Sequence, residues 1–257
     1  QSYKAIELII IDDCSTDGTN ALLDKIDNSI VKIITLPKNS GAYYARNIGL
    51  FIASGEYITT VDSDDIISYD RIEKLVNTIE ANEKLKLVEG RFIRNNSEGE
   101  LQYKLFTRGV GNGIFRRSII DDLGYFMPVK GGADNEYSNR INSFYGDESN
   151  AVVNQFTYWA IERGDGLTSI NPQNSSSRAE FVNYYDRLHN KGEKIKIEFP
   201  WRLNNKYVSK VRKMEIAQTS YLEKIQDIKI QVGTKSIEKG VDENLNTRVI
   251  AYLSQGI

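Results

Sequence analysis

The feature that most constrains the fold is an alternation, over the first third of the chain, of short apolar runs with polar stretches of helical character. Nearly continuous apolar runs are typical of strands that are covered on both faces, as in a parallel sheet. Strands that alternate with helices in this way predict an α/β fold with right-handed crossovers. The expected strands cover residues 6–11, 31–36 and 55–61, and the expected helices run to about 27, over 41–53 and over about 69–82.

Carboxylates follow two of these apolar runs directly. Asp12 and Asp13 end the first run, and Asp62, Asp64 and Asp65 end the third. Ligands of open α/β sheets bind just outside the carboxyl ends of the strands. Clustered acids repel one another, and a fold tolerates them most easily where a divalent cation or a cationic partner binds. The chemistry is therefore expected at this edge, and the alternative is that the acids cap the helices that follow.

The pattern changes from residue 87 onward. Two strands are expected over 87–94 and 101–106, around a polar turn. A soft boundary near 190–200 separates a main domain, residues 1–190, from a lysine-rich and partly helical extension, residues 191–257. The remaining expected elements are short helices over 117–123 and 134–142, a β-rich stretch over 151–162 and a helical stretch near 208–228.

Composition narrows the class of protein. The 257 residues include 33 basic and 35 acidic side chains, which gives no electrostatic footprint for nucleic acid. The single cysteine, Cys14, cannot form an internal disulfide and fits a reducing compartment, and no apolar run approaches the length of a membrane span. We therefore expect a cytoplasmic protein. The lysine-rich C-terminal region leaves open whether it packs on the main domain or docks peripherally on the inner face of an acidic membrane.

Several short motifs occur in a fixed order over residues 1–145. They are ELIIIDDCSTDGT at 7–19, NSG and ARN within 39–47, GEYI leading into DSDD at 55–65, and GNGIFRR, GYF and ADNE between 111 and 136. Together they resemble the motifs of family 2 glycosyltransferases. The resemblance implies a GT-A fold, in which helices flank a mixed and mostly parallel central sheet, with a mainly helical C-terminal extension here. It also implies that the first strand and helix of the fold precede Gln1.

On the donor side, the resemblance points to the end of the first strand and to the helix after the second. Asp12 and Asp13 can accept from a base N–H or a ribose hydroxyl, and by similarity to the family Asp13 contacts the uracil or ribose. The alternative is a pair of helix-capping acids. Arg46 can pair with Asp13 or Asp62, or can steady the base, and a structural role for it is equally open.

The Asp62-Ser63-Asp64-Asp65 segment resembles the family's DxD motif. The resemblance places Asp64 directly on Mn²⁺ or Mg²⁺, Asp62 on the ribose or the water shell of the metal, and Asp65 as a second ligand. Both are hard ions that take oxygen ligands and bridge pyrophosphate. Such an ion would neutralise the charge that builds on the departing nucleoside diphosphate.

Asp134 is the candidate general base. Inverting transfer needs a carboxylate that takes the proton of the attacking hydroxyl, and Asp134 occupies the place of the acidic motif that carries the base in the resembled family. Ala133 departs from that motif, since an acid is common there. Glu136 is the second candidate for the base, and the alternative for Asp134 is a role as helix N-cap.

The resemblance implies an inverting transferase that moves a single sugar from a nucleotide-diphospho-sugar, with a UDP-sugar as first choice, to a hydroxyl of a glycan or lipid-linked acceptor, as in bacterial polysaccharide biosynthesis. The sequence shows no Gln-x-x-Arg-Trp motif, which argues against processive synthesis. Two alternatives stay open. One is a sugar nucleotidyltransferase, although no glycine-rich phosphate loop is evident. The other is a truncated, inactive module that binds glycans or a partner.

Overall fold

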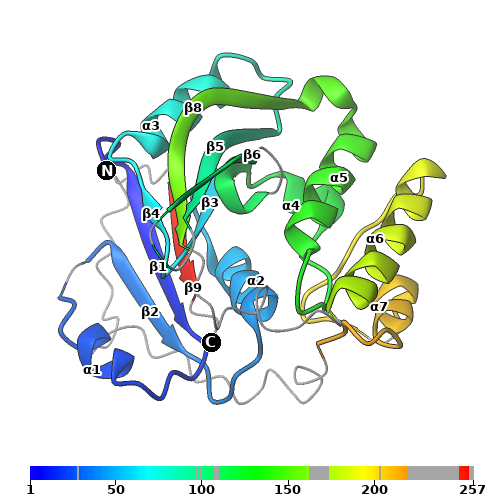
Figure 1. Ribbon diagram of the computed structural model, residues 1–257, viewed down its shortest axis with the longest axis horizontal. Coiled ribbons are helices and arrows are strands. Elements are labelled where there is room, and N and C mark those ends of the chain that lie inside the picture. The colour runs from blue at the N-terminus through cyan, green and yellow to red at the C-terminus, as the bar shows by residue number, and fades with distance from the viewer. Residues whose placement is uncertain are drawn as a thin grey trace.

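Figure 1 shows the computed structural model as a mixed sheet with helices packed against it. The structure describes residues 1–27, 29–95, 98, 100–106, 110–161, 174–202, 204–218 and 249–254. The strands are β1 Ile6–Asp12, β2 Val31–Thr35, β3 Tyr57–Asp62, β4 Ile66–Ile67, β5 Leu87–Asn95, β6 Leu101–Phe106, β7 Gly113–Arg116, β8 Asn150–Ile161 and β9 Val249–Ser254. The helices are α1 Thr19–Leu23, α2 Ala42–Ile52, α3 Arg71–Glu80, α4 Ile119–Leu123, α5 Ala133–Tyr145, α6 Asn174–Asn190 and α7 Lys206–Val211, with short 3₁₀ turns η1 Val110–Asn112 and η2 Asp147–Ser149.

The strands form one sheet in the order β2-β1-β9-β3-β7-β5-β8-β4, and β6 pairs with β5. Pairing is parallel from β2 through β3 and again between β5 and β8. The other described pairs are antiparallel. The predicted α/β class and mixed sheet are confirmed, and the parallel part contains both strands that end in the acids of interest.

The helices α2 and α3 contribute to different apolar clusters. In α3, Ile72, Leu75, Val76 and Ile79 recur at helical spacing, so that they make one buried stripe. These side chains join a cluster with residues of β3, β5 and β7. The helix α2 belongs to the larger cluster, which also takes in residues of β1, α5 and α6. The position of α2 in that cluster, next to the ends of β1 and β3, allows its polar side chains to reach the sheet edge.

The described residues beyond 190 do not form a core of their own. Ile195, Ile197, Val208 and Val211 belong to the larger apolar cluster of the main domain, and Trp201 Nε1 donates to the carbonyl of Phe126 over 2.8 Å. The expected helix near 208–228 is the short α7, and the part of that expectation from 219 onward lies outside the described residues.

The strand β9 was not expected. It lies between β1 and β3 and is parallel to both, with Ser254 opposite Ile11 on one side and Asp62 on the other. In Figure 1 this red strand runs between the blue and cyan strands of the N-terminal third. The C-terminal part of the chain is therefore a component of the central sheet. Among the described residues, no helix is long and apolar enough to cross a lipid bilayer.

Candidate active site

The two acids at the end of β1 have different surroundings. The carboxylate of Asp13 accepts from the backbone N–H of Ser40 over 2.6 Å and from that of Gly41 over 2.7 Å, just before α2 begins. Burial raises the pKa of Asp13 to about 6, against the lowering effect of the two amides, and neighbouring Asp12 adds to the rise. Both oxygens of Asp13 thus hold the turn that precedes α2, which favours a structural role for this residue.

Asp12 is held on one side only. Its Oδ1 accepts from the backbone N–H of Ser15 over 3.2 Å. Its Oδ2 is buried and has no hydrogen-bond partner among the described residues. A buried carboxylate oxygen without a donor is costly, so this atom is the better candidate to accept a hydrogen bond from a ligand.

The acids that follow β3 are held by two residues from elsewhere in the chain. Arg46, from α2, donates through Nη2 to Asp62 Oδ1. Burial acts to lower the pKa of Arg46, but nearby Asp62 and Asp134 and the Tyr43 hydroxyl together raise it above its usual value. The guanidinium therefore carries its charge at the sheet edge. Arg46 Nε is buried with no hydrogen-bond partner among the described residues.

Tyr158, from β8, fixes the turn after β3. Its hydroxyl donates to Asp65 Oδ2 over 2.5 Å and accepts from the backbone N–H of Asp62 over 3.3 Å. Within the turn, the N–H of Asp65 donates to the carbonyl of Asp62 over 3.1 Å. Asp64 lies between them and is half-buried. The turn is thus shaped by its flanking acids, with Asp64 in its middle.

The described residues contain no group of three or more His, Cys, Asp or Glu side chains placed to hold a metal ion. A complete protein cage is therefore absent from this part of the chain. Mg²⁺ and similar hard ions are commonly held by one or two carboxylates together with substrate phosphates. The oxygen donors of Asp62 and Asp64 fit that mode, in which the diphosphate of a donor completes the coordination.

Asp134 lies in the first turn of α5, which begins after Gly132, a glycine with φ of 86°. Its Oδ1 accepts from the hydroxyl of Tyr43 over 2.7 Å. The other oxygen faces the η1 segment, because a Cβ placed on Gly111 would lie 4.0 Å from Oδ2. Asp134 is half-buried and is not the N-cap.

Glu136 lies two residues further on and has a different environment. It is fully buried, and Arg140 donates to both of its oxygens, from Nε over 2.9 Å and from Nη2 over 2.5 Å. His189 Nε2 lies 3.5 Å from the same carboxylate. Burial acts to raise the pKa of Glu136, but Arg140 and His189 bring it below its usual value. This enclosed ion pair favours a structural role, and the function proposed below does not use Glu136 as a base.

Four side chains of the site form a continuous chain of contacts that runs from Asp134 to Asp62. Asp134 is bound to Tyr43, the ring of Tyr43 lies 5.1 Å from the Arg46 guanidinium carbon, and Arg46 is paired with Asp62. Sequence reasoning missed Tyr43 and Tyr158. Both contact acids more than ninety positions away in the sequence, and no local pattern marks a tyrosine for such a role.

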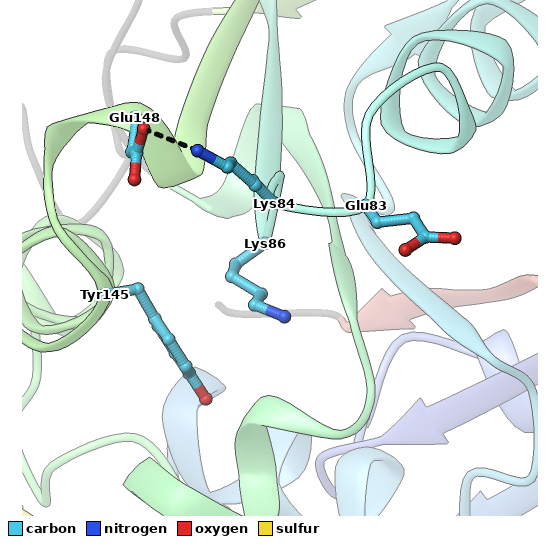
Figure 2. Close-up of a pocket in the computed structure, with 5 residues that line it drawn as sticks. All are labelled: Glu83, Lys84, Lys86, Tyr145 and Glu148. Carbon is cyan, nitrogen blue, oxygen red and sulfur yellow. Dashed lines mark hydrogen bonds and ion pairs between the residues drawn. The ribbon is translucent and has the colours of Figure 1, made fainter.

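An open surface pocket lies at the opposite edge of the sheet. Figure 2 shows its lining residues, with Lys84 Nζ paired to Glu148 over 3.2 Å and Lys86 beside Tyr145. The pocket adjoins the amino ends of β5 and β8, which run parallel to one another. Because β3 runs in the same direction, through antiparallel β7, its acids lie at the other edge. This pocket is not part of the candidate active site.

The mixed α/β fold is that of the GT-A glycosyltransferases. A crystal structure of GalNAc-T7 with UDP, GalNAc and Mn²⁺ matches with a TM-score of 0.54 at 18% identity, over 71% of this chain and 44% of that one. The family model described as glycosyl transferase family 2 matches residues 1–128. The chain belongs to glycosyl transferase family 2, as its motifs predict.

Two curated relatives share this N-terminal part. An uncharacterized glycosyltransferase of Haemophilus influenzae is 45% identical over 111 residues, which are 42% of this chain and 43% of the relative. The UDP-Glc:alpha-D-GlcNAc-diphosphoundecaprenol beta-1,3-glucosyltransferase WfaP of Escherichia coli is 44% identical over 82 residues, 31% of this chain and 32% of WfaP. The matched part is less than half the length of each relative.

Proposed function

We propose that the chain binds a nucleotide-diphospho-sugar, with a UDP-sugar as first choice, and transfers its sugar with inversion to a hydroxyl of a glycan or lipid-linked acceptor. The observation that carries the proposal is the line from Asp134 through Tyr43 and Arg46 to Asp62. It links the half-buried Asp134, the proposed base, through α2 to Asp62, one of the acids proposed to hold the sugar nucleotide. Both residues that connect them belong to α2.

The donor side is proposed to use Asp12, Asp62 and Asp64. The Oδ2 atom of Asp12, which has no hydrogen-bond partner among the described residues, would accept from a base N–H or a ribose hydroxyl. Asp62 and Asp64 would hold Mn²⁺ or Mg²⁺ together with the diphosphate, and the ion would supply positive charge to the leaving group. The UDP and Mn²⁺ named with GalNAc-T7 and the UDP-Glc named for WfaP support this choice of donor and metal.

The acceptor side is proposed to use Asp134 as general base. Its Oδ1 is held by Tyr43, and its Oδ2 lies towards Gly111. The Oδ2 atom takes the proton of the acceptor hydroxyl as that oxygen attacks the sugar carbon from the face opposite the diphosphate. The bond from the carbon to the diphosphate breaks in the same step, which inverts the carbon. We further propose non-processive transfer, in the cytoplasm, within bacterial polysaccharide assembly.

Calorimetric titration with UDP tests the donor half of this proposal. We expect binding that is strong with Mn²⁺ or Mg²⁺ and is weakened at least about tenfold by EDTA, because the ion bridges carboxylates and phosphates that otherwise repel. Parallel titrations with GDP and dTDP decide the nucleotide. Absence of nucleotide binding under every metal condition would contradict the transferase and support a module that binds without catalysis.

A screen of UDP-, GDP- and dTDP-sugars tests the catalytic half. Release of the nucleoside diphosphate is measured with water and with simple sugar acceptors, and the anomeric configuration of the product is read by NMR. Formation of sugar 1-phosphate and nucleoside triphosphate from the same donors when pyrophosphate is added would instead point to a nucleotidyltransferase. A product that retains the configuration of the donor would contradict the single displacement.

A further inference from the structure

The hydroxyl of Tyr43 is the meeting point of three groups at the start of α5. It donates to Asp134 Oδ1 over 2.7 Å. It accepts from the backbone N–H of Gly132 over 3.1 Å, and the N–H of Asp134 lies 3.5 Å away. One phenol oxygen therefore binds both the carboxylate of Asp134 and the backbone turn that carries it. Rotation of the carboxylate would break the first of these bonds.

The ring of Tyr43 is itself held on two sides. Its centroid lies 5.6 Å from that of Phe126 and 5.1 Å from the guanidinium carbon of Arg46, and the residue is 6% exposed. A tyrosine packed in this way has little freedom to follow a moving partner. Tyr43 thus acts as a fixed point to which the carboxylate of Asp134 is attached.

The protonation state of Tyr43 agrees with this geometry. Burial and the nearby Asp134 both hold the pKa of Tyr43 far above the usual tyrosine value. The phenol consequently keeps its proton and can only donate to the Asp134 carboxylate. Oδ1 is occupied by this bond, and Oδ2 is the oxygen that faces Gly111.

We propose that Tyr43 is a positioning residue that selects Oδ2 of Asp134 as the atom that takes the acceptor proton. The inference rests on the proposed function. Tyr43 itself exchanges no proton and contacts no reacting atom. Its removal lets the Asp134 carboxylate rotate, so that the productive orientation becomes one among several. The nucleotide side, which is held by other contacts, keeps its affinity.

The test compares Tyr43→Phe with Tyr137→Phe in the full chain. Tyr137 lies on α5 with Asp134, is fully buried, and donates from its hydroxyl to the carbonyl of Gly124 over 2.7 Å. Each change removes one buried hydroxyl and keeps the ring. The assay measures release of UDP from whichever of UDP-glucose, UDP-galactose and UDP-N-acetylglucosamine the wild-type protein uses fastest, with melting temperature and UDP affinity measured alongside.

For Tyr43→Phe we expect kcat to fall about tenfold to a hundredfold, the range of a lost hydrogen bond to a charged group, with donor KM and UDP affinity within about twofold of wild type. Tyr137→Phe should lower the melting temperature and leave kcat within about twofold. Asp134→Asn should lower kcat further than Tyr43→Phe does. The double variant should have a kcat close to that of Asp134→Asn alone, because the two residues act as a unit.

Three outcomes would overturn the inference. In the first, Tyr43→Phe keeps the wild-type kcat while Asp134→Asn is inactive. In the second, Tyr43→Phe loses kcat and UDP affinity together, as a general structural defect would. In the third, the wild-type protein releases no UDP from any of these donors, which refutes the proposed function for UDP-sugars and the inference with it. The first two leave the proposed function intact, so the failures are distinguishable.

Discussion

The donor edge and the acceptor side of the site share one arrangement of acids. At the end of β1, both oxygens of Asp13 are bound by backbone amides, whereas Asp12 has one oxygen without a partner among the described residues. On α5, both oxygens of Glu136 are bound by Arg140, whereas Asp134 is held through Oδ1. In each pair one acid has both oxygens bound by protein donors, and we propose that the other presents an oxygen to a ligand.

The comparison teaches that acids close together in a motif need not share a role. A fixed scaffold requires the structural acid to be fully paired, because a buried charge without partners is costly. A reactive or ligand-binding acid requires orientation and also one oxygen left for the ligand. Counting hydrogen bonds on each carboxylate therefore separates the two roles, where the motif alone treats them alike.

The largest expected effect is on catalysis by Asp134→Asn. Loss of a general base typically lowers the rate about 10²–10⁴-fold, and the amide keeps the size of the side chain and one oxygen for Tyr43. Turnover of the best donor from the screen measures the effect, and circular dichroism confirms that the fold is kept. Near-normal turnover of this variant would remove Asp134 from the mechanism.

Glu136→Ala should have the next largest effect, and it should fall on stability. Removal of one partner of a buried ion pair typically costs about 3–5 kcal/mol, because Arg140 is then left charged in the interior. Urea unfolding measures the loss. If Glu136→Ala were stable and inactive while Asp134→Asn stayed active, the roles assigned to the two acids on α5 would be reversed.

Asp12→Asn should weaken UDP binding at the donor edge. Loss of a hydrogen bond to a charged group corresponds to about 1.5–3 kcal/mol, or roughly tenfold to a hundredfold in the dissociation constant. Calorimetric titration in the presence of Mn²⁺ measures it. Asp13→Asn is the matched control, and we expect its UDP affinity to stay within about threefold of wild type. The reverse result would restore Asp13 as the ligand of the base or ribose.

The parts of the fold and of the candidate site that the sequence predicts are those that depend on local contacts. The helices α2, α3 and α5 lie close to their predicted ranges. The signals that predict them, apolar spacing and neighbouring turn residues, lie within or next to each segment. The acids at the ends of β1 and β3 were placed by the same local reasoning. Their common edge follows from the parallel pairing that strand–helix alternation predicts.

The features that sequence reasoning missed all depend on distant partners. Residues 249–254 were expected to belong to a partly helical extension, with no strand there, and the position of β9 is set by backbone pairing with β1 and β3. The different environments of the two acids on α5 come from the Tyr43 hydroxyl, which binds Asp134, and from the burial of Glu136. No periodicity distinguishes two acids two positions apart, because only their surroundings differ.

The smallest expected effect is a pH dependence of stability that comes from Asp13. Its pKa in the folded protein is about 6, above the usual aspartate value of 3.8, because burial disfavours the charged form. The folded state therefore binds more protons than the unfolded state between these values. The stabilisation that Asp13 contributes is fully present below about pH 4 and is lost as pH rises through about 6.

Urea unfolding of the wild-type protein and of Asp13→Asn, measured from pH 4 to pH 7, tests this sign. The variant should gain about 2 kcal/mol relative to wild type over that range, since one pKa unit corresponds to about 1.4 kcal/mol. Carboxyl ¹³C NMR should show Asp13 titrating near 6. Titration near the usual aspartate value would mean that the amides of Ser40 and Gly41 balance burial, and the pH dependence from Asp13 would vanish. Titration below the usual value would mean that the amides outweigh burial, and the pH dependence would have the opposite sign.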